Sequence, residues 1–250
     1  MFKKLLSLAF VMLTCLACNS QKTEQIKVGD DDVLRTKSGK EMSFLFIKHA
    51  SFVINYDNLS IQIDPVSKME PATDYSTFPK ADFIFVTHEH FDHFDKDAIA
   101  SLTGEKTQVI LNKKCAEMLG SGTAMSNGET LKLRDDITVE AVPAYNTTEG
   151  HQQFHPKGRD NGYVLTLDGL RIYIAGDTED IPEMEQLKDI DIAFLPCNQP
   201  YTMTPEQLAH AATMIKPGVV YPYHFSETPA DEMKKALDGV KIKAIFRNMQ

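Results

Sequence analysis

The amino-acid sequence predicts an α+β fold in which β-sheets are covered by helices. Short runs rich in β-branched and aromatic residues come first in hairpins and then alternate with helical stretches, which is typical of such layered folds. One hairpin sequence also occurs twice, and this repeat indicates two similar halves. The 250 residues are 42% hydrophobic and 24% charged, the composition of a globular protein with a proper core. We place the fold in one domain over residues 41–250.

The order of strands and helices follows from hydrophobic periodicity and turn residues. Strands are predicted over Ser43–Lys48, Phe52–Tyr56, Leu59–Asp64, Asp82–Thr87, Val109–Asn112, Ile137–Val142, Tyr163–Leu167, Arg171–Ala175, Ile192–Pro196, Val219–Tyr223 and Lys241–Phe246. Helices are predicted over about Lys96–Leu102, Lys113–Leu119, Ile181–Leu187, Pro205–Ile215 and Pro229–Leu237. One helix has a clear start, because Thr204 is a good cap, Pro205 takes the first helical position and Gln207 the third.

The repeated hairpin spans residues 53–64 and 164–175, and the two copies agree at five of their twelve positions. In each copy, two alternating strands flank a two-residue turn, Asp57-Asn58 or Asp168-Gly169, that suits a type I′ hairpin. The alternative is a coincidental match, since hairpins are common. A true repeat would give two similar halves, each with an acidic residue near the end of its hairpin.

The N-terminal segment has the pattern of an export signal. Lys3 and Lys4 precede an uncharged apolar run, residues 5–17, which is too short to span a bilayer but fits a signal peptide. Cys18 follows Ala17 as in bacterial lipoprotein signals, where the cysteine is acylated. We therefore expect a signal peptide over residues 1–17 and an exported protein that Cys18 anchors to a membrane of the bacterial envelope. The alternative is a secreted or periplasmic soluble protein.

Charge and cysteine content exclude several classes of protein. Residues 18–40 are polar and include an acidic cluster, residues 30–32, so we expect a tether there. The 26 Lys and Arg against 35 Asp and Glu give a net charge of -9, which disfavours nucleic acid as a partner. Four cysteines in this arrangement build neither a disulfide framework nor a Cys-rich zinc module. We expect Cys115 and Cys197 to be small buried side chains.

The chemistry of the sequence is concentrated in residues 87–93, which read Thr-His-Glu-His-Phe-Asp-His directly after a predicted buried strand. His88 and His90 are two residues apart, so on an extended segment their side chains point the same way and can bind one metal ion. Asp92 and His93 follow where the chain turns and can reach a second metal ion. Imidazole and carboxylate ligands suit zinc, iron or manganese better than calcium. If the three histidines of this segment served only for packing, several polar rings that need hydrogen-bond partners would be buried, which is unfavourable.

This motif resembles that of the metallo-β-lactamase superfamily, and the resemblance covers nearly everything from Met42 to the end. Residues 174–178, Ile-Ala-Gly-Asp-Thr, resemble the bridging-carboxylate motif of that family, and residues 221–224, Tyr-Pro-Tyr-His, its last histidine. Residues 49–52, His-Ala-Ser-Phe, and 63–65, Ile-Asp-Pro, resemble the UlaG-like branch, whose members are hydrolases. The resemblance implies an αββα four-layer sandwich of two similar halves.

The resemblance also implies a set of metal ligands. It assigns His88 and His90 to the first ion, Asp92, His93 and His224 to the second, and Asp177 as the bridge between them. The first ion lacks a third ligand, because the family has a histidine just past the strand Ile137–Val142 where this chain has Asn146. We choose His155, whose loop is stiffened by the following proline. His151 and Asn146 remain the alternatives.

Other polar residues have weaker claims to a role. Asp64 either orients a metal-binding histidine or is a turn residue, and His49 either lines the pocket or is structural. We expect His210 to be an exposed helical residue. Lys157, Arg159 and Tyr201 are candidates to contact an anionic substrate.

Two metal ions define the expected function. A pair of divalent cations, expected to be Zn²⁺ with Mn²⁺ or Fe²⁺ as alternatives, lowers the pKa of a shared water, so hydroxide is available as nucleophile. The expected enzyme is a hydrolase of a small ester, lactone or phosphodiester, in which Asp92 is the catalytic residue that orients the nucleophile. The alternative is a non-catalytic metal-binding lipoprotein that retains the fold, although such a protein need not keep both sets of ligands.

Overall fold

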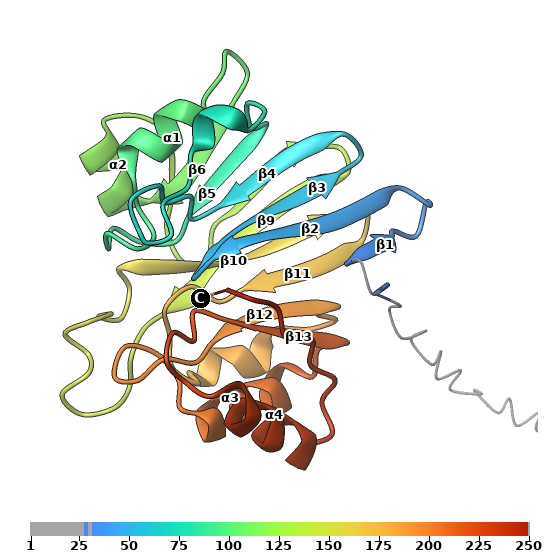
Figure 1. The fold of residues 1–250 in the computed structure, drawn as a ribbon, viewed down its shortest axis with the longest axis vertical. Coiled ribbons are helices and arrows are strands. Elements are labelled where there is room, and N and C mark those ends of the chain that lie inside the picture. The colour runs from blue at the N-terminus through green and yellow to red at the C-terminus, as the bar shows by residue number, and fades with distance from the viewer. Residues whose placement is uncertain (1–27, 30–31, 250) are drawn as a thin grey trace, which may run out of the picture.

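The computed structural model describes residues 28–29 and 32–249 and consists of two β-sheets with helices on their outer sides (Figure 1). The expected signal peptide and Cys18 lie outside the described residues. Among those residues, no helix combines the length and apolar character that crossing a membrane requires.

The first sheet has the strand order β1-β2-β3-β4-β5-β6-β7 and the second the order β13-β12-β11-β10-β9-β8. The strands of the first sheet are β1 Val33–Arg35, β2 Glu41–Lys48, β3 Ser51–Tyr56, β4 Leu59–Ile63, β5 Phe83–Val86, β6 Gln108–Asn112 and β7 Thr123–Met125. Those of the second are β8 Thr130–Arg134, β9 Ile137–Ala144, β10 Asp160–Leu167, β11 Leu170–Ile174, β12 Ile192–Pro196 and β13 Val219–Tyr223. The helices are α1 Lys96–Leu102, α2 Lys113–Leu119, α3 Pro205–Ile215 and α4 Ala230–Gly239, with 3₁₀ turns at Tyr75–Thr77 and Pro182–Gln186.

The two halves share one topology. In each sheet a run of antiparallel strands, β1 to β4 or β8 to β11, is continued by parallel strands, β5 to β7 or β12 to β13. The repeated hairpins are β3–β4 and β10–β11, at corresponding places. Both central residues of each turn have positive φ, 48° and 65° at Asp57-Asn58 and 49° and 79° at Asp168-Gly169, as a type I′ turn requires. The expected sandwich of two similar halves is therefore confirmed.

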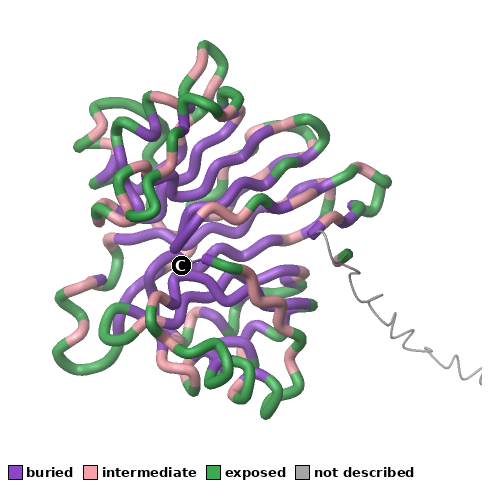
Figure 2. Tube along the Cα trace, in the orientation of Figure 1, coloured by how far each residue is buried: buried purple, intermediate pink, exposed green. Residues whose placement is uncertain are grey.

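The layers follow from strands that are apolar on both faces. In β5, Phe83 and Phe85 pack between the two sheets, whereas Ile84 and Val86 pack beneath α1 and α2. Helices α3 and α4 cover the outer face of the second sheet (Figure 1). Figure 2 shows the buried residues following the strands, with exposed residues on the helices and loops.

Aromatic rings join the two sheets. Phe52 on β3 stacks on Phe194 of β12 with ring centroids 4.2 Å apart, and Phe44 on β2 meets the same ring edge-on at 5.3 Å. Such pairs contribute about 0.5–1.5 kcal/mol each beyond the area they bury. The interior between the sheets is thus a rigid support for the loops at the strand ends.

Three strands were not predicted and one predicted strand is missing. β1 lies inside the segment expected to be a tether, because Val33–Arg35 pairs with the start of β2. β7 and β8 are short and largely exposed, so their apolar pattern is weak. Residues 241–246 form only one bridge, between Ala244 and Val220. The expected helix Ile181–Leu187 is a 3₁₀ turn with one buried residue, Met184.

Candidate metal centre

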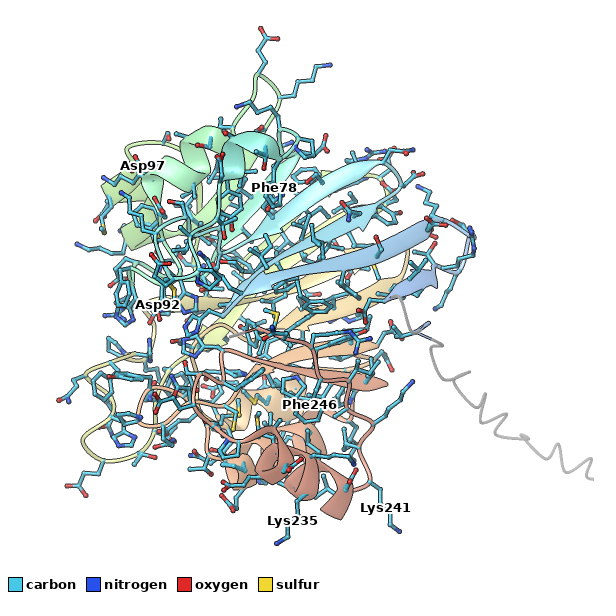
Figure 3. The ribbon with its side chains drawn as sticks, viewed as in Figure 1. Phe78, Asp92, Asp97, Lys235, Lys241 and Phe246 are labelled. Carbon is cyan, nitrogen blue, oxygen red and sulfur yellow. The ribbon has the colours of Figure 1, made fainter. Side chains whose placement is uncertain are left out.

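The predicted ligands come together at one end of the sandwich. His88, His90, Asp92 and His93 follow β5, Asp177 follows β11, His224 follows β13, and His155 lies in the loop between β9 and β10. Figure 3 shows Asp92 at the edge of the molecule where the two halves meet. Parallel strands end at the same edge of a sheet, which is why residues so far apart in sequence meet here.

The loop after β5 turns back on itself. The backbone N–H groups of His93 and Phe94 both donate to the carbonyl of His90, at 3.0 and 2.8 Å. His88 and His90 therefore lie before the turn and Asp92 and His93 after it. This local geometry divides one short motif between two groups of side chains, as the sequence predicts.

The first group is formed by His88, His90 and His155. The Nδ1 atom of His90 lies 3.1 Å from Nε2 of His88 and 3.2 Å from Nε2 of His155. Two nitrogens that bind one tetrahedral zinc ion at about 2.0–2.1 Å lie roughly 3.3 Å apart. The spacing of these three imidazoles therefore fits one metal ion.

The structure places the three alternatives for the last ligand differently. His155 is buried with its Nε2 atom in the first group, while its Nδ1 atom lies 2.9 Å from Oδ1 of Asn146. Asn146 thus lies behind His155 and fixes its orientation, as carboxylates and amides behind metal-binding histidines do. His151 points to Glu179 instead, at 3.2 Å. Of the two histidines, His155 belongs to a group of candidate ligands and His151 does not.

The second group contains Asp92, His93 and His224, together with His49. Oδ2 of Asp92 lies 3.6 Å from Nε2 of His224 and 3.9 Å from Nε2 of His93. Asp177 lies between the two groups. Its Oδ2 atom is 3.2 Å from His224 and 3.4 Å from His155, and its Oδ1 atom is 3.2 Å from His93. This position suits a bridging carboxylate.

Unpartnered buried atoms point to a cation in this place. Among the described residues, Nε2 of His93, Oδ1 of Asp177 and both ring nitrogens of His224 are buried without a hydrogen bond. Buried polar atoms are nearly always paired in proteins, so these unpartnered atoms among the candidate ligands need an explanation. Imidazole nitrogens and a carboxylate oxygen are donors that zinc, iron and manganese accept. The residues present therefore fit a pair of metal ions.

The electrostatics of the two groups differ. Burial lowers the pKa of His155 to about 4 and, with the help of His93, that of His88 well below its usual value. Neutral imidazoles with free lone pairs are what a metal ion needs. In the second group, burial opposes protonation of His224, but the charge of Asp177 raises its pKa to about 9. The carboxylates of the second group thus favour a positive charge beside them, and a bound metal cation would supply that charge.

Asp64 supports the centre from behind. Its carboxylate is fully buried and accepts from the backbone N–H and the hydroxyl of Thr87, both at 2.8 Å, while Oδ2 lies 2.8 Å from Nδ1 of His93. Of the two roles considered for Asp64, the contacts are those of a residue that orients a metal-binding histidine. Thr87 itself was not singled out from the sequence, although its place before the first histidine was visible.

Gly176 lets Asp177 approach the histidine loop. It has φ of +67°, and a side-chain carbon there would lie 2.9 Å from the carbonyl of Asn161 and 3.3 Å from Thr87. A larger residue would be strained and would push Asp177 away from His88. Glycine is therefore required directly before Asp177.

Sequence reasoning missed the residue that holds the loop of His155. Glu179 is fully buried and accepts at 2.7 Å from the backbone N–H groups of Thr147 and Thr148 and from the Thr147 hydroxyl. Its place two residues after Asp177 was the available signal, since both follow β11. One short segment thus carries both the bridge and the anchor of the loop.

The cations expected to meet an anionic substrate are engaged elsewhere. Lys157 pairs with Glu183 at 2.7 Å and donates to the hydroxyl of Tyr145. Arg159 forms a fork with Asp160 at 2.7 and 2.9 Å and reaches Glu89 at 3.3 Å. Neither side chain is thus an unpaired charge available for an anion.

Removal of the third imidazole distinguishes the alternatives for the first group. We expect His155→Ala to lower the affinity for the first metal ion strongly, because two imidazoles remain where three nitrogens converge. Asn146→Ala should lower it about 10–100-fold, the usual effect of removing a hydrogen-bond partner behind a ligand. His151→Ala is the matched control. Metal titration of the three purified variants checks this order, and a larger loss in His151→Ala than in His155→Ala would contradict it.

The protein is a two-sheet sandwich with imidazole and carboxylate groups at its strand ends. This fold and this centre are those of the class of metal-dependent hydrolases. The family model described as "Beta-lactamase superfamily domain" matches residues 43–224. The chain therefore belongs to the β-lactamase superfamily, as its resemblance to the metallo-β-lactamases implied.

Known proteins agree with this membership. A UPF0173 metal-dependent hydrolase from Thermococcus onnurineus is 34% identical over 217 residues, which are 80% of this chain and 94% of that protein. A solved structure from Parabacteroides distasonis, assigned as a metal-dependent hydrolase, is 54% identical with a TM-score of 0.84 and covers 88% of this chain and 98% of its own. A metallo-β-lactamase fold protein from Bacillus subtilis shares the fold alone, at 13% identity and a TM-score of 0.64 over 81% of this chain and 89% of its own.

Proposed function

We propose that this protein hydrolyses a small ester, lactone or phosphodiester with the help of two divalent metal ions, preferably Zn²⁺. The observation that carries the proposal is the position of Asp177 between the two groups of candidate ligands, within 3.4 Å of His155, His93 and His224. His88, His90 and His155 would hold the first ion, and Asp92, His93 and His224 the second. When bound, the two ions would supply hydroxide from water near neutral pH.

The protein's own residues would bind, orient and exclude water. Asp92 is more exposed than Asp177, with 18% of its side chain exposed against 3%. It would therefore face the substrate and orient the attacking oxygen, which bonds to the acyl carbon or phosphorus as the bond to the leaving oxygen breaks. Hydrolysis consumes one water, whose two protons end on the new carboxyl or phosphate group and on the hydroxyl of the leaving oxygen. The apolar interior behind the centre would keep further water out.

Neutral substrates are favoured among the candidates. The ion pairs of Lys157 and Arg159 leave these cations committed to Glu183, Asp160 and Glu89. Beside Asp92, in contrast, Phe91 is 80% exposed. An exposed aromatic ring next to the reacting groups suits an uncharged, partly apolar substrate.

This preference gives a direct prediction. With matched leaving groups, we expect kcat/KM for a neutral ester or lactone to exceed that for the corresponding phosphodiester. We expect Arg159→Ala to leave this ratio of kcat/KM values unchanged, because the charge of Arg159 is already paired and would not contact the phosphodiester. A panel of chromogenic esters, lactones and phosphodiesters measures the ratio. Faster turnover of the phosphodiester would contradict the preference for neutral substrates. It would not contradict the proposal that the protein is a hydrolase.

The test of the proposed function is hydrolysis that depends on metal. The purified full-length protein is stripped with a chelator, reloaded with Zn²⁺, Mn²⁺ or Fe²⁺, and assayed against the same panel. We expect activity to disappear with the metal and to return with it. A protein that binds two ions but hydrolyses none of these classes would favour the alternative, a non-catalytic metal-binding lipoprotein. This alternative is not favoured, because a relative of this chain is named a metal-dependent hydrolase.

We also assign the chain to the UlaG-like branch of the superfamily. Two observations support it, both in the segments that carry the resemblance. His49 lies 3.1 Å from Asp92, and the hydroxyl of Ser51 donates to the carbonyl of Asp64 at 2.5 Å. The two segments that resemble this branch are thus in contact with each other and with the candidate centre.

We propose a lipid anchor at Cys18. The signal pattern of residues 1–17 supports the anchor, with a soluble exported protein as the alternative. The described chain enters the domain at β1 on one side of the molecule, whereas Asp92 lies on the other (Figures 1 and 3). Mass spectrometry of the mature protein tests the anchor, and an unmodified Cys18 would refute it.

A further inference from the structure

His49 occupies a strained position next to the candidate centre. It directly follows β2 and has φ of +50°, a conformation that is uncommon for residues other than glycine. It is also buried, with a relative exposure of 7%. Strained backbone of this kind costs about 1–3 kcal/mol and persists where the surrounding structure holds it in place.

The backbone of His49 is held on both sides. Its carbonyl accepts from the N–H of His224 at 3.0 Å, and its own N–H donates to the carbonyl of Met249 at 2.5 Å. The rings of His49 and His224 lie together with centroids 3.8 Å apart. The end of β2 is therefore fastened to the segment that carries the last candidate ligand.

The side chain of His49 reaches a second candidate ligand. Its Nε2 atom lies 3.1 Å from Oδ2 of Asp92, within hydrogen-bonding distance. This nitrogen thus already has a partner, unlike Nε2 of His93 and of His224, which have none. A neutral His49 protonated at Nε2 would donate this hydrogen bond, so we place it beside Asp92 as its partner rather than as a further metal ligand.

We propose that His49 is the positioning residue of the second metal ion. Through its side chain and its backbone it sets the distance between Asp92 and His224, which reach the centre from different halves of the chain. This inference rests on the proposed function, because it assumes that a second ion binds there. It makes the second ion, and not the first, depend on His49.

The experiment compares His49→Ala and His49→Gln with the wild type. Metal-stripped full-length proteins are titrated stepwise with Co²⁺, followed by visible absorption and by elemental analysis of bound metal. In His49→Ala we expect the affinity for the second ion to fall about 10–100-fold, as for other residues that orient ligands, and that for the first to stay unchanged. His49→Gln should largely restore the second ion, because its amide N–H₂ can donate to Asp92 from a similar position.

Controls separate positioning from structural damage. His210→Ala removes an exposed histidine that pairs with Asp180, outside the groups of candidate ligands, and should bind both ions as the wild type does. Circular dichroism establishes that each variant is folded. Equal loss of both ions in folded His49→Ala, unchanged binding of both, or no rescue by His49→Gln would overturn the proposal. Binding of fewer than two ions by the wild type would instead refute the dinuclear site itself.

Discussion

Replacement of Asp92 by alanine is expected to reduce hydrolysis to about a thousandth of the wild-type rate or less, comparable to the loss of a main transition-state contact. Asp92 has 18% of its side chain exposed at the centre and lies within 4 Å of His93 and His224. Its loss removes both a candidate ligand of the second ion and the carboxylate that would orient the nucleophile. Because it lies in a loop rather than in the core, the fold should persist.

The rate is measured with the best substrate of the panel at saturating metal, so that weaker binding of the second ion is not the whole effect. Asp97→Ala is a matched control, since Asp97 is an exposed aspartate in α1 that pairs with Lys68 at 2.6 Å (Figure 3). It should retain wild-type activity. Turnover by Asp92→Ala within a few fold of that control would show that the nucleophile does not depend on Asp92.

Replacement of Asp64 by alanine is expected to have the largest effect on stability. The substitution removes the shared acceptor of the Thr87 backbone N–H, the Thr87 hydroxyl and Nδ1 of His93 in a fully buried place, and the hydroxyl keeps Nδ1 of His88 at 3.0 Å. An unsatisfied buried donor costs about 1–3 kcal/mol, so we expect the free energy of unfolding to fall by roughly 3–5 kcal/mol. Asp64→Asn keeps one acceptor oxygen and should lose less.

Urea denaturation of the chelator-treated proteins measures this effect without a contribution from bound metal. Asp82→Ala serves for comparison, because Asp82 accepts one hydrogen bond, from the N–H of Ser60 at 2.9 Å. It should cost clearly less than Asp64→Ala. A loss in Asp64→Ala no greater than in Asp82→Ala would mean that Asp64 is only the turn residue that the sequence also allowed.

Much of the fold could be predicted because local signals and tertiary structure agree. The turns at Asp57-Asn58 and Asp168-Gly169 are type I′ as their residues indicate, and α3 begins at the capping box formed by Thr204 and Gln207. The exceptions are segments stabilised by a neighbour rather than by their own pattern. β1 exists because it pairs with β2, and residues 241–246 do not extend the second sheet because Val220 is the one described residue of β13 with which they form backbone hydrogen bonds.

The candidate centre was predictable where its residues are close in sequence. The spacing of His88, His90, Asp92 and His93 already divides them into two groups, as the turn at His90 does in the structure. What the sequence left open was the choice among residues on a long loop, since His155, His151 and Asn146 differ only in how that loop folds. The contact of His49 with Asp92 was likewise hidden, because the two residues are far apart in sequence and meet only where the segments after β2 and β5 converge.

The number of metal ions bound per chain tests the central claim most directly. The purified full-length protein is reloaded with Zn²⁺ and dialysed to equilibrium, and bound metal is measured by elemental analysis against protein concentration. We expect two ions per chain in the wild type and loss of ions from both positions in Asp177→Asn, because this carboxylate lies between the two groups. One ion or none in the wild type, or two ions still bound by Asp177→Asn, would contradict a centre bridged by Asp177.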